Sequence, residues 1–161
     1  MINEEQYNKQ LITLETKLSN LQHLKNLQLI TLPITSKSII TFQTTPNDSI
    51  TQSFMIRYND NYQSPVLYFK IMKLELVTQD FLEFESWKPI INPNQIKELI
   101  NQDQIQFGMT QVEDTRGNWW FIHPCDTTEI LQNSTNDEFL INWFSVFGGI
   151  FINFKIDDLL K

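Results

Sequence analysis

Cysteine and histidine are scarce in this sequence, which has one cysteine and two histidines. A lone cysteine cannot form a disulfide within the chain. One cysteine with two histidines also falls short of the ligands that a structural zinc site needs. No glycine-rich phosphate-binding pattern is present either. We therefore expect a protein that needs no metal and no cofactor.

Long apolar runs are missing too. The longest lies over residues 144–154 and is broken by Gly148-Gly149, whereas a membrane-spanning helix needs about 20 apolar residues. The first five residues, Met1-Ile2-Asn3-Glu4-Glu5, are polar and acidic, unlike a signal or transit peptide. We expect a soluble cytoplasmic protein with no transmembrane segment.

Basic residues are fewer than acidic ones, 12 against 19, and the net charge is −7. This balance argues against nucleic acid or an anionic membrane as the main partner. The four glycines and six prolines are too few for a collagen-like or proline-rich segment. Apolar residues are abundant, at 41% of 161 residues. That content predicts one folded domain over residues 1–161.

The spacing of apolar residues predicts a helix near the N-terminus, followed by strands. Residues 4–24 carry apolar side chains at steps of three and four, which are Tyr7, Leu11, Leu14, Leu18 and Leu21. Short polar turns then separate four strand-like runs, over 27–34, 38–44, 52–58 and 66–77. Such strands favour an antiparallel meander. The mixed segment 80–91 is either a short strand or an exposed loop anchored by Phe81, Phe84 and Trp87.

The second half predicts a hairpin between helices. A helix over 93–101 would turn Ile96, Leu99 and Ile100 inward. Strands over 104–113 and 118–122 would pair across the turn 114–117. A helix over 136–147 would place Phe139, Trp143, Val146 and Phe147 on one side, and Gly148-Gly149 could end it in a left-handed cap. A last short helix would follow, and the whole is an α+β fold.

The segment 118–128 changes structural type midway. Residues 118–122 are aromatic and β-branched and suit a buried strand, which Pro124 would end because it has no N–H to donate. Asp126 with Glu129 forms the pattern of a helix N-cap with a capping box. Cys125 would thus lie at the start of a helix, where the pKa of a thiol tends to fall.

Cys125 is the plausible nucleophile of the chain, although free cysteines are also common as small buried apolar residues. His123 would face the same side as Cys125 in an extended segment, so it could act on the thiol or could hold the loop by a backbone hydrogen bond. His23, on the first helix, is the other histidine, and a papain-type Cys–His site is poorly supported. Acyl transfer by thioester exchange does not need a strong local base.

These residues resemble a known family. The run His123-Pro124-Cys125-Asp126-Thr127 is similar to the His-Pro-Cys motif of the autophagy conjugating enzymes, which are divergent relatives of ubiquitin-conjugating enzymes. The run 143–148, Trp-Phe-Ser-Val-Phe-Gly, is similar to a Trp-x-Ser segment of the autophagy-related protein ten family. The run 58–67 resembles that family's Tyr-x-x-x-Tyr-x-x-Pro pattern before a central strand. The resemblance covers about residues 50–150 and implies a ubiquitin-conjugating-enzyme-like fold.

The resemblance also implies an activity. Cys125 would accept the C-terminal glycine of the ubiquitin-like autophagy modifier twelve from the activating enzyme, autophagy-related protein seven. It would then pass the modifier to a lysine of autophagy-related protein five. His123 and Tyr62 match positions that the family uses near the cysteine. In ubiquitin-conjugating enzymes an Asn steadies the oxyanion, and here Asn118 and Tyr62 are the two hypotheses for that role.

Two alternatives stay open at this point. The lipid-conjugating relative carries the same motif, but it resembles a longer chain with a large acidic insert that is absent here. A non-catalytic binding module of the same fold would instead hold a partner through a sheet edge and the aromatic residues Phe81, Phe84 and Trp87. The enzyme interpretation implies a cytoplasmic location, to which recruitment to the pre-autophagosomal structure could be added.

Overall fold

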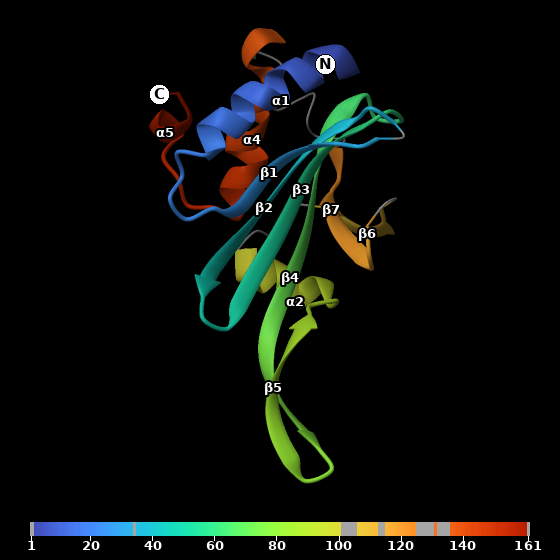
Figure 1. Cartoon of the computed structure of the whole chain (residues 1–161), viewed down its shortest axis with the longest axis vertical. Helices are drawn as coiled ribbons and strands as arrows, with labels where there is room; N and C mark the ends of the chain where they lie inside the picture. Colours follow the sequence, from blue (N-terminus) through green and yellow to red (C-terminus); the bar gives the residue numbers. More distant parts are fainter. Residues whose placement is uncertain are drawn as a thin grey trace.

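A computed structural model describes residues 2–33, 35–100, 106–112, 115–124, 131 and 136–160. It confirms the α+β prediction, with an N-terminal helix, an antiparallel sheet of seven strands and C-terminal helices. Cys125 and the predicted helix start at Asp126 lie outside the described residues. Figure 1 shows the helices α1, α4 and α5 gathered on one face of the sheet and a long arm leading away from it.

Helix α1 (Glu4–Leu18) begins with a capping box between Asn3 and Gln6 and buries the predicted apolar stripe from Tyr7 to Leu18. It ends six residues before the predicted boundary at residue 24. The Ser19 hydroxyl donates to the Thr16 carbonyl at 2.7 Å. Such side-chain bonds offer the backbone an alternative to the helix, so the chain leaves it although Leu21 is still buried.

The sheet is an antiparallel meander extended by a hairpin. Its strands run in the order β1-β2-β3-β4-β7-β6, and β5 pairs with a second part of β4. The strands are β1 (Lys25–Thr31), β2 (Ser38–Asn47), β3 (Ile50–Asn59), β4 (Ser64–Gln79), β5 (Leu82–Pro89), β6 (Phe107–Gln111) and β7 (Asn118–Ile122). The predicted meander and the predicted β6–β7 hairpin are therefore confirmed.

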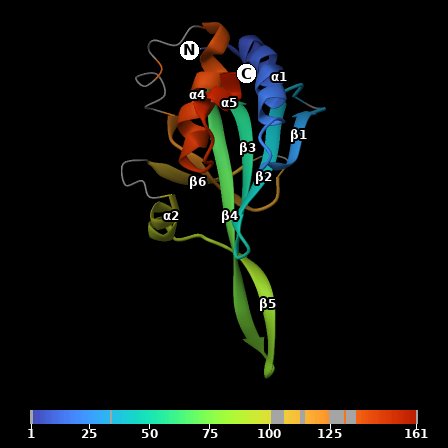
Figure 2. The same cartoon turned by 90° about the vertical axis from the view of Figure 1, so that its left-hand side faces the viewer.

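Strand β4 pairs with different strands along its length. Its first part pairs with β3 as far as Lys73 and with β7 at Tyr68 and Phe69, whereas its last part pairs with β5. Asp80 and Phe81 both have positive φ, 51° and 65°, which is typical of the two-residue turn that joins such strands. Residues 75–87, called the arm below, project from the body (Figures 1 and 2). Segment 80–91 is thus mainly strand.

Five short helical segments among the described residues follow the strands or lie between them. They are α2 (Pro93–Ile100), the 3-10 helix η2 (Asn136–Glu138) that leads into α4 (Phe139–Phe147), the 3-10 helix η3 (Gly148–Ile150) and α5 (Ile156–Leu160). The inward assignment of Leu99 is wrong, since Leu99 is 45% exposed, and Val146 does not join the buried side of its helix, since it is 37% exposed. In α4 the buried positions are Phe139, Leu140, Trp143, Phe144 and Phe147. That stripe is rotated away from Val146.

The predicted left-handed cap at Gly148-Gly149 is also wrong. Gly148 has φ −69° and ψ −36°, and the chain continues from α4 directly into η3. The glycine is required for a different reason. A Cβ placed on Gly148 would lie 2.6 Å from Cζ of Phe144, so a side chain there would collide with a buried ring of the same helix.

The main core lies between the helices and one face of the sheet. It includes Tyr7 of α1, Phe42 and Phe54 of the meander, and Trp143 and Phe144 of α4. A smaller cluster covers the opposite face, called the outer face below, and contains Ile39, Met55, Val66, Tyr68 and Val112, with Leu32, Trp119 and Phe121 packed against it. Within the described ranges, no helix is long and apolar enough to cross a membrane.

Candidate active site

The described part of the candidate site stops just before the cysteine. Cys125 lies outside the described residues, but His123 and Pro124 directly precede it, and Pro124 is buried. Strand β7 ends at Ile122, and Pro124 follows after one further residue, His123, so the strand stops before the proline as the sequence predicts. The described part of the site thus consists of the residues that lead to Cys125 and of their neighbours.

His123 continues the β6–β7 hairpin by one residue. Its backbone N–H donates to the carbonyl of Gln106 at 3.0 Å, one step beyond the last paired residues, Phe107 and Ile122. This bond, made by the main-chain N–H, holds the backbone of the segment in place. The imidazole is partly buried. It is thus available for contacts on the outer face.

Tyr62 reaches His123 from a different part of the chain. It lies in the turn between β3 and β4, where Asn59 Oδ1 accepts from the backbone N–H groups of Asn61 at 3.0 Å and of Tyr62 at 3.3 Å. Its ring centroid lies 5.7 Å from that of His123, and the ring planes meet at 69°. This edge-on geometry is one that aromatic rings favour. The structure therefore brings together two of the predicted site residues, 61 positions apart.

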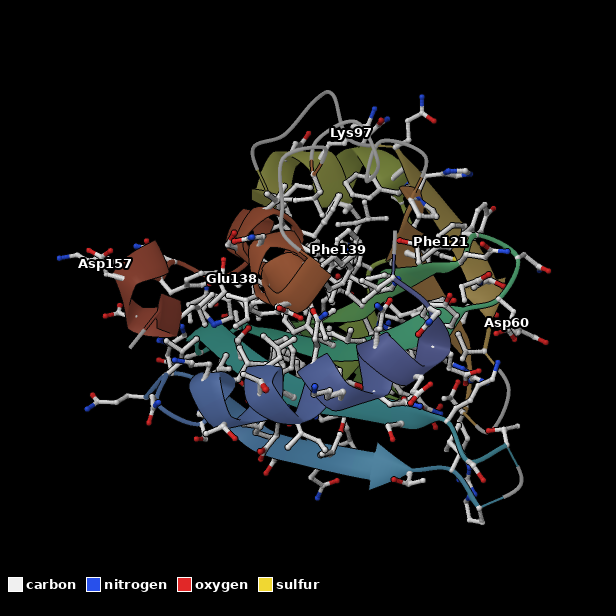
Figure 3. The ribbon with its side chains drawn as sticks, turned by 90° about the horizontal axis from the view of Figure 1, so that it is seen from above. Asp60, Lys97, Phe121, Glu138, Phe139 and Asp157 are labelled. Carbon is white, nitrogen blue, oxygen red and sulfur yellow. The ribbon has the colours of Figure 1, made fainter. Side chains whose placement is uncertain are left out.

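The ring contacts continue beyond His123 along the outer face. Phe121 lies 6.0 Å from His123 and 6.2 Å from Tyr68 between ring centroids. Figure 3 shows Phe121 on β7 and Asp60 in the β3–β4 turn on the same side of the molecule, away from Asp157 of α5. Sequence analysis missed Phe121. The available signal was its position two residues before His123, because such residues share a face in a strand.

Asn118 does not share this site. It stands at the start of β7, paired with Gln111, and is exposed. Five residues of strand separate it from His123, which is about 16 Å at 3.3 Å per residue. Of the two oxyanion hypotheses, only Tyr62 lies beside the segment that leads to Cys125.

His23 lies at the far end of α1 from this site. It follows the C-terminal end of that helix and lines a hollow with Leu21 and with Asp158 of α5. The N-terminal end of α1 is the one near the site, since Asn3 and Gln6 line a hollow with Tyr58 and Asp60. A 15-residue helix is about 22 Å long. The structure thus gives no support to a joint role for the two histidines.

A polar hollow of about 400 Å³ opens on the outer face beside the Tyr62 turn, lined in part by Lys37, Arg57, Asp60 and Tyr68. Lys37 and Asp60 form an ion pair across it. Burial raises the pKa of Tyr58, which also lines the hollow. In the portion of the chain that is described, no three His, Cys, Asp or Glu side chains are grouped so as to hold a metal ion.

Lys70 marks the other end of the outer face. Its ammonium lies 4.3 Å from the centroid of the Trp119 ring and donates to the carbonyl of Arg116. Removal of water around the side chain lowers the pKa of Lys70. These contacts fix the turn between β6 and β7, and hence the strand that carries His123 at its end.

Comparisons with known proteins concern the family and the fold of the chain. The family model described as autophagocytosis associated protein, active-site domain, matches residues 3–158. The solution structure of KmAtg10 aligns over 94% of this chain and 95% of its own, with a TM-score of 0.69 at 16% identity. The crystal structure of the autophagic E2 Atg10 aligns over 91% and 94%, with a TM-score of 0.63 at 18% identity. No curated protein sequence gives a significant match.

The two similar solved structures, at identities below 20%, show the fold of the chain. The match to the family model over nearly the whole chain shows its family. They confirm the resemblance noted in the sequence and the ubiquitin-conjugating-enzyme-like fold. The chain belongs to the family of autophagocytosis-associated proteins that carry this active-site domain, and its fold is that of Atg10.

Proposed function

We propose that Cys125 carries a ubiquitin-like modifier as a thioester and passes it to a lysine of a protein acceptor. The thiolate attacks the activated C-terminal glycine carbonyl of the modifier, and the thiol of the activating enzyme leaves. An acceptor amine then attacks the Cys125 thioester. The amide nitrogen–carbon bond forms, the carbon–sulfur bond breaks, and Cys125 returns to a thiol. The resemblance names the modifier, activating enzyme and acceptor as autophagy-related proteins twelve, seven and five.

The observation that carries this proposal is the contact of Tyr62 with His123, two residues before Cys125. Two elements distant in sequence present polar aromatic side chains to the segment that holds the chain's single cysteine. Such convergence is typical of a reaction site. In this proposal His123 lines the approach to the thioester, and the Tyr62 hydroxyl donates to the oxyanion of the tetrahedral intermediate.

The chemistry places modest demands on the site. A thioester is already activated, so the domain must hold the carbonyl, admit the amine and stabilise a transient negative charge. None of these steps calls for a metal or a cofactor, which agrees with the expectation from composition. The location that goes with this function is cytoplasmic, with residues 1–161 acting as one conjugating domain and with recruitment to the pre-autophagosomal structure.

A loading assay tests the proposal. The purified chain is incubated with the activating enzyme, the modifier and ATP, and products are separated with and without reductant. We expect an adduct that reductant removes, that is absent in Cys125→Ala, and that becomes resistant to reductant in Cys125→Ser because an oxygen ester replaces the thioester. Full conjugation by Cys125→Ala would refute the proposal. Transfer to an aminolipid in place of a lysine would assign the lipid-conjugating activity instead.

The arm favours one rival function, a binding module without catalysis. It exposes Phe81 fully, and Leu76, Phe84 and Trp87 are between 44% and 66% exposed. Among the strands that the structure describes, β5 pairs with β4 alone, so its other edge could take an added strand. Mild alkylation followed by mass spectrometry separates the two functions, since a reactive Cys125 is labelled in the native protein and an inert one is not.

A further inference from the structure

Strand β6 has a glycine, Gly108, where a side chain would collide with β7, the strand that leads to His123. Gly108 pairs directly with Phe121 across the β6–β7 ladder. A Cβ placed on Gly108 would lie 2.4 Å from both Cε1 and Cζ of the Phe121 ring. No real Cβ tolerates such a distance, so the ring occupies the space that any other residue at 108 would fill. Glycine is needed here because the Phe121 ring lies close to the backbone of β6, and not because the chain turns.

Phe121 is held from three directions. Gly108 lies on its β6 side, Tyr68 pairs with it on the β4 side with ring centroids 6.2 Å apart, and His123 follows two residues later on the same face. Phe121 and His123 rings lie 6.0 Å apart at 39°. Phe121 is only partly buried, so a ring displaced by a side chain at position 108 turns toward solvent or toward one of these neighbours, and either movement changes its contact with His123.

The position of the His123 ring therefore depends on Phe121. The main chain of His123 is held by the bond to Gln106, so the ring moves chiefly by rotating its side chain. One neighbour of that ring is Phe121, and another is Tyr62 at 5.7 Å. A shift of Phe121 changes the space on one side of the imidazole and, through it, the contact with Tyr62.

We propose that Gly108 and Phe121 are positioning residues, which together set the His123 ring against Tyr62. In this proposal neither residue acts on the reacting atoms directly. Gly108 acts by leaving room for Phe121, and Phe121 acts by supporting His123. The effect on catalysis rests on the proposed function, whereas the effect on ring position does not.

A spectroscopic test reads the ring position without any enzyme assay. The chain has two histidines, so the ring C–H signals of His123 and His23 can be assigned in an NMR spectrum of the whole protein. In Gly108→Ala we expect the His123 signals to shift, because the ring currents of Phe121 and Tyr62 act on them at a changed geometry. The His23 signals, at the far end of α1, should not shift.

The chain offers a matched control for the added methyl group. A Cβ on Gly149 would meet no atom within 4 Å, so Gly149→Ala makes the same chemical change without a collision. It should leave the His123 signals and the transfer rate as they are. Phe121→Leu provides a second variant, which keeps an apolar side chain at this strand position but removes the ring. It should shift the His123 signals even where Gly108→Ala folds poorly.

The same variants are then compared in single-turnover transfer from a preformed Cys125 thioester. We expect Gly108→Ala to slow transfer at least about tenfold, since misplacement by about 1 Å can cost about a hundredfold. The double variant with Phe121→Leu should be no slower than the slower single variant, because both changes act through one contact. Unchanged His123 signals in both single variants would overturn the proposal. If the wild-type chain forms no thioester, the proposed function fails, and the NMR result still decides the positioning role.

Discussion

Replacing Tyr62 by Phe separates the two things that this side chain offers to the site, a hydroxyl and a ring. The ring lies against His123, and the residue is 41% exposed, held by backbone bonds to the Asn59 side chain. Phe keeps the ring and does not alter those backbone bonds. An exposed hydroxyl adds little to stability, so Tyr62→Phe should unfold like the wild-type chain and any loss of activity should report on the chemistry.

The size of the loss depends on which feature acts. If the hydroxyl donates to the oxyanion, its removal should slow transfer about 100-fold to 1,000-fold, the usual effect of deleting one such donor. If only the ring matters, the contact is worth about 0.5–1.5 kcal/mol and Tyr62→Phe keeps it. Tyr62→Ala removes both features. We expect Tyr62→Phe and Tyr62→Ala to be slow to a similar degree.

The assay is single-turnover transfer from the preformed Cys125 thioester to the acceptor lysine, with loading by the activating enzyme measured separately. Circular dichroism and thermal unfolding of each variant exclude misfolding as the cause of a slow rate. A threefold change in rate corresponds to less than about 1 kcal/mol in the activation free energy. If Tyr62→Phe transfers the modifier within about threefold of the wild-type rate, the hydroxyl is not the oxyanion donor. A slow Tyr62→Ala beside it would leave a role for the ring alone.

Three further changes address other parts of the molecule. Gly148→Ala should lower the free energy of unfolding by about 1–2 kcal/mol, since overpacking against Phe144 costs about 1–3 kcal/mol and removing a glycine returns less than about 1 kcal/mol; urea unfolding measures this. Charge reversal at Glu83 and Glu85, both exposed on the arm, should weaken acceptor binding in a titration but leave thioester loading unchanged. Stability should also fall above pH 10.0, the ordinary pKa of tyrosine, because burial raises the pKa of Tyr7. In that range the unfolded chain loses the Tyr7 proton before the folded one does, which lowers the free energy of unfolding by about 1.4 kcal/mol per pH unit. Urea unfolding across that range should show a flatter profile in Tyr7→Phe.

Each of these has a clear contrary result. Gly149→Ala is the control for Gly148→Ala, and equal stability of the two variants would rule out the collision. Equal loss of loading and acceptor binding on reversal at Glu83 and Glu85 would remove the separate role of the arm. A steep alkaline loss that persists unchanged in Tyr7→Phe would assign it to other groups, such as Tyr58, whose pKa burial also raises.

The sequence alone determined the elements whose signals are local. The apolar stripe of α1 repeats every three or four residues, and turn residues separate the meander strands, so both can be predicted without knowing which segments pack against them. The same holds for the β6–β7 hairpin. The motif around Cys125 likewise identified the family before any contact was known, because it is a contiguous run of residues.

The tertiary structure decided what depends on neighbours distant in the chain. Segment 80–91 was ambiguous in isolation, and pairing with the end of β4 made it a strand. Gly148-Gly149 has the composition of a cap, yet Gly148 is required by the Phe144 ring above it. The contact of Tyr62 with His123, and the support of His123 by Phe121 over Gly108, join a turn to two strands. Periodicity reports which face a side chain occupies, whereas only the folded sheet fixes which rings meet there.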